Sequence, residues 1–188
     1  ACTDPTTSCQ MKDLTVSHNT VDNVGGFLFC VLQTGVGLDR NLDLSFRDNL
    51  INVPGAGALL GDCGGGAGLT RDTTTLNQAW PGPSWEWVNN SIVMNGTSGE
   101  SAGSYPQGTN SYPTNVSMLQ FTNLAARDYT LQASSPANNA ASDGTDRGVN
   151  FSAYNAARAG GNGGGGGGGG SVDLVPPAVP QGVFIRLN

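Results

Sequence analysis

The sequence predicts an all-β protein, a parallel β-helix (solenoid) of about four irregular coils, with long loops and an extended, glycine-rich C-terminal tail. The main evidence is one short sequence motif, called here the phrase, which occurs three times, at Leu14–Asn19, Leu44–Asn49 and Trp85–Asn90. Each copy has apolar residues at its first and third positions and an Asn at its sixth. Alternation at period 2 is typical of a strand with one buried face. No segment, in contrast, shows sustained helical periodicity.

The Asn that ends each phrase is expected to form a corner. Asn tolerates left-handed backbone and can bond its own chain through its side-chain amide. The intervals between these residues are 30 and 41, which indicates coils with loops of different length. Because a buried amide without a partner is costly, we predict that the three stack as a hydrogen-bonded ladder of Asn19, Asn49 and Asn90.

The order of elements follows from this pattern. Residues 1–158 are predicted to form the β-helix domain, with a disulfide-looped entry at 1–13 and a first coil at 14–33 that includes a second strand, Val24–Cys30. The next coil spans 42–60, a Gly/Thr-rich excursion spans 61–84, and residues 85–94 return to the stack. A polar excursion at 95–116 precedes a further alternating stretch at 117–132. The best helical candidate is the short stretch Phe151–Arg158.

The tail has a different composition. Residues 159–171 are Gly-rich, with Gly163 to Gly170 unbroken, and residues 172–188 are largely apolar. A free glycine run would be a flexible linker. We expect it to be held instead in a groove or by an assembly, with 172–188 lying as an extended strand on a sheet of its own or of a neighbouring chain.

Composition limits the classes of partner. Charged residues make up 12% of the chain, against a usual share of about 25%, and the net charge is −6. The seven Arg are scattered and Lys12 is the one Lys, so no face is suited to nucleic acid. No apolar stretch reaches 18 residues, so we expect no membrane span.

Cysteine usage favours a secreted, oxidising setting. We predict disulfides between Cys2 and Cys9 and between Cys30 and Cys63. A metal site built from all four is less favoured, because no C-x-x-C pair exists. We interpret the four glycosylation sequons as a product of composition; they lie at Asn89, Asn95, Asn115 and Asn150.

A resemblance adds to this reading. Asp128–Ala140 (DYTLQASSPANNA) followed by Asp143–Val149 (DGTDRGV) resembles the closing segment of secreted right-handed parallel β-helix proteins of the pectate-lyase-like superfamily. The three strand phrases are similar to the I-x-I-x-x-N-x-I repeat of the same superfamily. The resemblance covers about residues 14–155. It implies a right-handed helix of which this chain forms the last coils, with the earlier coils absent.

Catalytic candidates are few. Superfamily lyases usually need Asp clusters for calcium and an Arg or Lys base, and the hydrolases need several Asp and a Gly-His-Gly; neither pattern is visible here. His18, Asp48 and Asn89 occupy the same place in the phrase and should stack. A His beside a carboxylate can transfer protons, but we favour a hydrogen-bonded corner. Arg47 is interpreted as a surface partner of Asp48 rather than as a base.

Two possible ligand sites remain. Asp143 and Asp146 lie in a Gly loop that could hold calcium, the one cofactor the sequence suggests, although we favour a turn held by Asp side chains. Trp85 and Trp87 share a strand face, and with Trp80 they could stack on sugar rings. Core packing is the favoured reading of these three.

We therefore expect an extracellular structural or interaction module, without activity by itself, whose open coil end stacks on another copy or on upstream coils of the same precursor. Contacts of this kind that do not close form filaments. The alternative is the C-terminal part of a polysaccharide lyase or glycoside hydrolase that binds polysaccharide and carries its chemistry on missing coils.

Overall fold

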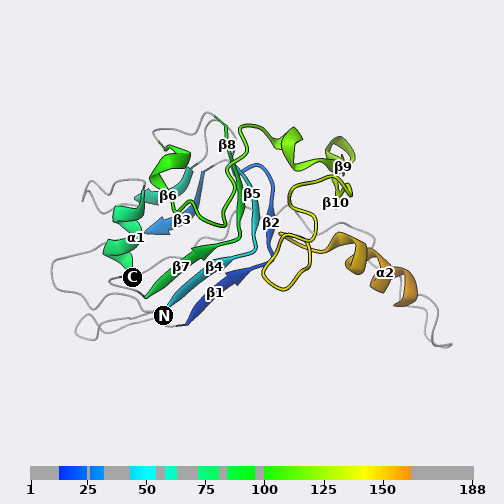
Figure 1. Cartoon of the computed structure of the whole chain (residues 1–188), viewed down its shortest axis with the longest axis horizontal. Coiled ribbons are helices and arrows are strands. Elements are labelled where there is room, and N and C mark those ends of the chain that lie inside the picture. The colour runs from blue at the N-terminus through cyan, green and yellow to red at the C-terminus, as the bar shows by residue number, and fades with distance from the viewer. Residues whose placement is uncertain are drawn as a thin grey trace.

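The protein is rich in parallel β-sheet and has few helices, as the computed structural model shows (Figure 1). The structure describes residues 13–24, 26–31, 43–53, 58–62, 72–80, 84–95 and 100–161. These elements are compatible with the predicted all-β class. No helix within these ranges is long and apolar enough to cross a membrane.

Three sheets are built from the repeats in turn. The first has the order β1 (Leu14–Ser17), β4 (Leu44–Arg47) and β7 (Trp85–Val88). The second has the order β2 (Thr20–Val21), β5 (Leu50–Val53) and β8 (Ser91–Met94). The third pairs β3 (Phe27–Val31) with β6 (Ala58–Asp62). All these pairs are parallel, and Figure 1 shows β1, β4 and β7 side by side.

The register matches the repeat. Leu14 pairs with Leu44 and Leu44 with Trp85, so the steps between strands are the 30 and 41 residues that separate the asparagines. In the third sheet Phe27 pairs with Ala58, a step of 31, because the second repeat has one more residue between its strands. Cys30 pairs with Gly61. The other three cysteines lie outside the described residues, so both disulfides stay predictions.

The core lies where the alternation places it. Leu44, Phe46 and Trp87 are buried, and the rings of Phe46 and Trp87 are 4.1 Å apart. The equivalent residues of the first strand, Leu14 and Val16, are only half-buried against the same cluster. Burial therefore falls off toward β1.

The alternating stretch 117–132 is not part of the parallel sheets. It contains a 3₁₀ turn, η2 (Val116–Leu119), then β9 (Phe121–Asn123), a 3₁₀ turn η3 (Leu124–Ala126) and β10 (Asp128–Leu131). β9 and β10 pair antiparallel. Gln120, which ends η2, and Arg127, which lies between η3 and β10, both adopt left-handed backbone (φ 53° and 58°). The 3₁₀ turn η3 and the left-handed Arg127 after it reverse the chain between β9 and β10.

The remaining helical segments lie in the two excursions and at the end of the described chain. The excursion 61–84 contains α1 (Thr73–Ala79), which the sequence analysis missed; Asp72 caps it by accepting a bond from Thr74 N at 2.7 Å. η1 (Ala102–Ser104) is a 3₁₀ turn, and α2 (Phe151–Gly161) confirms the helical candidate and extends it by three residues past 158. α2 projects away from the sheets (Figure 1). Residues 162–188 lie outside the described residues.

Candidate functional site

The predicted asparagine ladder is present. Asn19 donates from its backbone N and its Nδ2 to Asn49 Oδ1, and Asn49 donates in the same way to Asn90 Oδ1, all at 3.0 Å. Asn49 Nδ2 also donates to Val16 O, and Asn90 Nδ2 to Phe46 O, both at 2.9 Å. Asn49 and Asn90 are fully buried, so these bonds satisfy amides that water cannot reach.

The ladder has a fourth member that sequence reasoning missed. Asn90 donates from N and Nδ2 to Asn110 Oδ1 at 2.9 and 3.0 Å, and Asn110 Nδ2 donates to Trp87 O at 2.7 Å. Ser111 then forms an isolated parallel bridge with Ser91. The available signal was the Asn-Ser pair of residues 90–91, which recurs at 110–111. No alternating apolar phrase precedes this second pair, so the repeat pattern does not include it.

The left-handed corner residue is not the asparagine that the sequence analysis assigned. It is the residue before, because His18, Asp48 and Asn89 have φ values of 53°, 57° and 53°. This residue makes the bend, and the Asn that follows is left free to point its amide along the stack. The expectation that these three residues occupy equivalent corners agrees with their shared backbone geometry.

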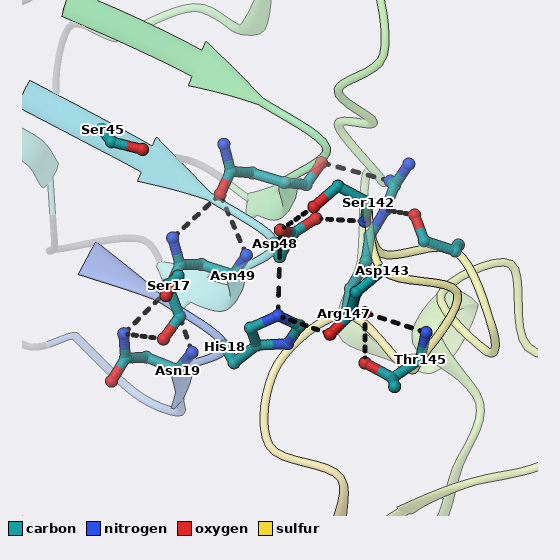
Figure 2. A network of polar contacts seen from close by, with 12 residues as sticks. Ser17, His18, Asn19, Ser45, Asp48, Asn49, Ser142, Asp143, Thr145 and Arg147 are labelled. Carbon is teal, nitrogen blue, oxygen red and sulfur yellow. Dashed lines mark hydrogen bonds and ion pairs between the residues drawn. The ribbon is translucent and has the colours of Figure 1, made fainter. Parts of the chain in front are cut away.

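A polar network joins this corner to the loop at residues 142–149, here called the closing segment (Figure 2). Asp48, with 1% of its surface exposed, accepts bonds from Ser142 N at 2.7 Å and Ser142 Oγ at 2.6 Å. His18 Nε2 lies 3.8 Å from Asp48 Oδ2 and 3.4 Å from Asp143 Oδ2. The carboxylates of two different segments thus face one imidazole.

This network is not arranged for nucleophilic catalysis. The Ser142 hydroxyl donates to a carboxylate and not to the imidazole, so the imidazole is not placed to accept its proton. Asp48 is buried and doubly bonded, which leaves it no access to a substrate. The described partners of the Asp48 carboxylate are Ser142 and His18, whereas Arg47, which was interpreted as its partner, points to solvent. The hydrogen-bonded corner is therefore the better interpretation.

Arg147 hydrogen-bonds the closing segment to the corners of the later repeats. Its Nη1 donates to Asn90 O at 3.3 Å and to Ser91 Oγ and Ser111 Oγ at 3.1 Å, and its Nη2 donates to Thr109 O at 2.9 Å. Burial lowers the pKa of Arg147, and the nearby Asp48 carboxylate opposes that shift. Sequence reasoning did not identify this residue, because its role depends on contacts 36 to 57 residues away.

The same segment also touches the first two repeats. Gly148 N donates to Asp48 O at 2.7 Å, and Val149 N donates to Thr20 Oγ1 at 3.0 Å. Gly148 has φ of 79°, and a Cβ added there would lie 2.4 Å from Thr20 Oγ1 and 2.9 Å from Leu50 Cβ. The closing segment therefore fastens together the corners of successive repeats.

The calcium candidates are engaged in the turn that we favoured. Asp143 Oδ1 accepts from Thr145 N at 3.0 Å and from Thr145 Oγ1 at 2.7 Å, and these bonds lower the pKa of Asp143. Asp146 Oδ1 accepts from Asn139 N at 2.9 Å. Within the described ranges, no three His, Cys, Asp or Glu residues are grouped so as to hold a metal ion.

The tryptophans do not form a sugar platform. Trp80 and Trp87 are each 2% exposed and belong to the core, so the packing interpretation holds for them and the platform interpretation is wrong. Trp85 is half-buried, and its Nε1 donates to Asn77 Oδ1 at 3.0 Å. It borders an open groove of about 310 Å³ at the start of the first sheet, which is lined by Asp13, Thr15, Asp43, Leu44, Ser45, Ser84, Trp85 and Glu86.

At the end of the stack formed by β7, β8 and β6, the described residues cover the ladder and the edge of β6. Asn110 N donates to Gln107 O at 3.0 Å, and Asn110 Nδ2 donates to Pro106 O at 3.1 Å as well as to Trp87 O. The Glu100 carboxylate accepts from Leu59 N at 2.7 Å and Leu60 N at 3.0 Å. Since β6 has no further strand beside it among the described residues, this carboxylate covers backbone donors that a third strand would otherwise meet.

The opposite end, formed by β1, β2, β3 and Asn19, is called the open end. Each of these strands is the outermost of its sheet in the described part of the chain. Asn19 is exposed, and its Oδ1 has no partner among the described residues. Its Nδ2 turns back to Ser17 O of its own strand at 2.9 Å (Figure 2). The Nδ2 atoms of Asn49 and Asn90 donate instead to a carbonyl of the previous repeat.

Comparison with models of known protein families, with curated proteins and with solved structures found no match. The resemblance to β-helix proteins therefore rests on sequence motifs alone.

Proposed function

We propose that the chain is part of a right-handed parallel β-helix and acts as an extracellular structural and interaction module. Its open end stacks on a further coil, supplied by a second copy or by another stretch of polypeptide. The order of strands supports the helix, because each repeat adds one strand in turn to three parallel sheets. The right hand follows from the strong preference of crossovers between parallel strands.

The single observation that carries the proposal is the difference between the two ends. At one end the ladder finishes in the turn at Asn110 and β6 is covered by Glu100, whereas at the other end the ladder stops at an exposed Asn19. An outermost strand with unpaired backbone groups is a template for another strand. The half-buried Leu14 and Val16 add apolar surface beside it. Such an end gains both hydrogen bonds and apolar contact by accepting a coil.

No observation favours the carbohydrate-active alternative over this one. The groove beside Trp85 is lined by the carboxylates of Asp13, Asp43 and Glu86, and the described part of its lining holds no basic residue. These three carboxylates would repel an acidic polysaccharide.

The test is strand addition at the open end. Amide hydrogen exchange is measured on the full chain, alone over a wide range of concentration and with a synthetic peptide that reproduces residues 44–53. The proposal expects amides of β1 and β2 to become protected either by self-association or by the peptide. A chain that stays monomeric and whose β1 amides exchange equally fast with and without peptide would contradict it.

A further inference from the structure

We propose that the open end selects a coil that presents two N–H donors at the asparagine corner, and that this coil is not a second copy of the chain. This inference rests on the proposed stacking function and specifies its partner. The occupant to which the structure points is a parallel coil with an Asn at the position equivalent to Asn49.

The ladder has a direction, and the direction defines the two ends. Every bond between successive members runs from the backbone N and Nδ2 of the earlier residue to Oδ1 of the later one. The first member, Asn19, therefore presents an acceptor outward. A coil placed before it completes the ladder only if that coil supplies donors.

A second copy stacked head to tail does not supply them. The end of the second copy that would meet the open end presents Asn110. However, Asn110 N already donates to Gln107 O, and its Nδ2 donates to Trp87 O and Pro106 O. The other ladder residues of a second copy also donate from N and Nδ2 within their own chain. Head-to-tail contact would therefore require the turn at Asn110 to open.

A two-fold dimer through the open ends is disfavoured for a different reason. It would place Asn19 Oδ1 of one copy toward the same end of its partner, which also presents an acceptor. Two acceptors without a donor between them remain unsatisfied when water is excluded. Head-to-tail stacking and two-fold dimerisation thus both leave the Asn19 Oδ1 acceptor without a donor. A coil of the repeat type, with an Asn at the corner, supplies that donor.

The apolar surface of β1 is also suited to a parallel coil of the repeat type. Leu14 and Val16 are half-buried, but Leu44 and Phe46, which occupy the equivalent positions one repeat later, are 2% and 1% exposed. The difference is the cover that a neighbouring strand provides on each side of β4. A coil with apolar residues at the first and third positions of its phrase would give β1 that cover.

Two peptides test the inference on the intact chain. One reproduces residues 44–53 and keeps the corner Asn; the other differs only by Asn49→Asp, which replaces the side-chain donor by an acceptor. Isothermal titration measures both affinities, and sedimentation measures the association state of the chain. We expect a monomeric chain that binds the Asn peptide at least tenfold more tightly than the Asp peptide.

The outcomes separate this inference from the function on which it rests. Self-association of the chain, or equal binding of the two peptides, would overturn the donor selectivity and leave the stacking function standing. A monomeric chain that binds neither peptide would overturn both. Val16→Lys should abolish peptide binding if the peptide occupies the open end, and Met118→Lys, at an exposed residue away from the sheets, should leave it unchanged. Urea unfolding of both variants checks that they fold.

Discussion

At the scale of single residues, stability is concentrated where a side chain completes the bonding of two repeats at once. Asn49 receives two N–H donors on its Oδ1 and gives its own Nδ2 to two acceptors. Asn19, its chemical equivalent, sits exposed at the open end with fewer partners. Asn49 and Asn19 occupy the same repeat position, but we expect Asn49 to contribute much more to the free energy of unfolding.

Asn49→Ala should lower the free energy of unfolding by about 3 kcal/mol, because it leaves several buried groups without partners. Asn19→Ala is the matched control, and its exposed side chain should cost less than about 1 kcal/mol. Urea unfolding measures both variants. Equal costs would show that the buried ladder does not contribute more than its exposed end.

Gly148 tests the attachment of the closing segment. Gly148→Ala places a methyl group against Thr20 Oγ1 and Leu50 Cβ in addition to straining a left-handed backbone. Gly144→Ala has the same φ of 79° but nothing within 4 Å, so it isolates the backbone strain of about 1 kcal/mol. Gly148→Ala should cost about 2 kcal/mol more than this control. If the two variants unfold alike in urea, the close approach at Thr20 is not important for stability.

At the scale of elements, the third sheet has two strands in the described part of the chain, and a carboxylate takes the place of a further strand beside β6. Glu100 accepts from two backbone donors of β6, and the buried Tyr105 hydroxyl donates to the same carboxylate at 2.9 Å. Burial, reinforced by Glu100, raises the pKa of Tyr105 well above its ordinary value of 10.0. Burial also raises the pKa of Tyr112, to about 12.

This arrangement predicts a loss of stability at high pH. Above pH 10 a tyrosine ionises in the unfolded chain while Tyr105 and Tyr112 remain protonated in the folded one, so the folded state binds more protons. Their contributions are complete below pH 10 and decline as the pH rises, for Tyr112 up to about 12. Urea midpoints from pH 8 to 11 measure the slope. Tyr105→Phe should make it shallower, and an unchanged slope would exclude Tyr105 as a cause.

At the scale of the whole molecule, the chain is asymmetric along its stack. The turn at Asn110 and the Glu100 carboxylate lie at one end, and the exposed Asn19 marks the other. The closing segment runs along the corners between them, from Thr20 to Ser111. The proposed extracellular setting belongs to this scale too, since it depends on cysteines spread over residues 2 to 63.

The secreted assignment predicts that all four cysteines are paired, as Cys2–Cys9 and Cys30–Cys63. Thiol titration of the denatured, unreduced protein should find no free thiol, and mapping of the linked peptides identifies the pairs. Two or more free thiols would contradict both the pairing and the oxidising setting. Reduction should destabilise the chain by about 2–5 kcal/mol if both bonds form.

The sequence by itself determined the parallel stack and its register, because both follow from local alternation and from an Asn at a fixed place in each phrase. The intervals of 30 and 41 residues between the asparagines are the register steps that the sheets show. The burial of Trp87 and the turn at Asp143 also followed from local chemistry.

Only the tertiary structure decided how the stack is closed. The residues that hold its ends and corners form hydrogen bonds with partners 20 to 94 positions away, and no local pattern encodes such partners. These residues are Arg147, Ser142, Glu100 and Asn110. The antiparallel pairing of β9 and β10 depended on a chain reversal that includes left-handed backbone at Arg127, a residue type that rarely signals it. The direction of the ladder, and with it the acceptor at the open end, depended on which atom of each amide faces the next repeat. A sequence places the amide at the corner, but only packing against the neighbouring carbonyl decides its orientation.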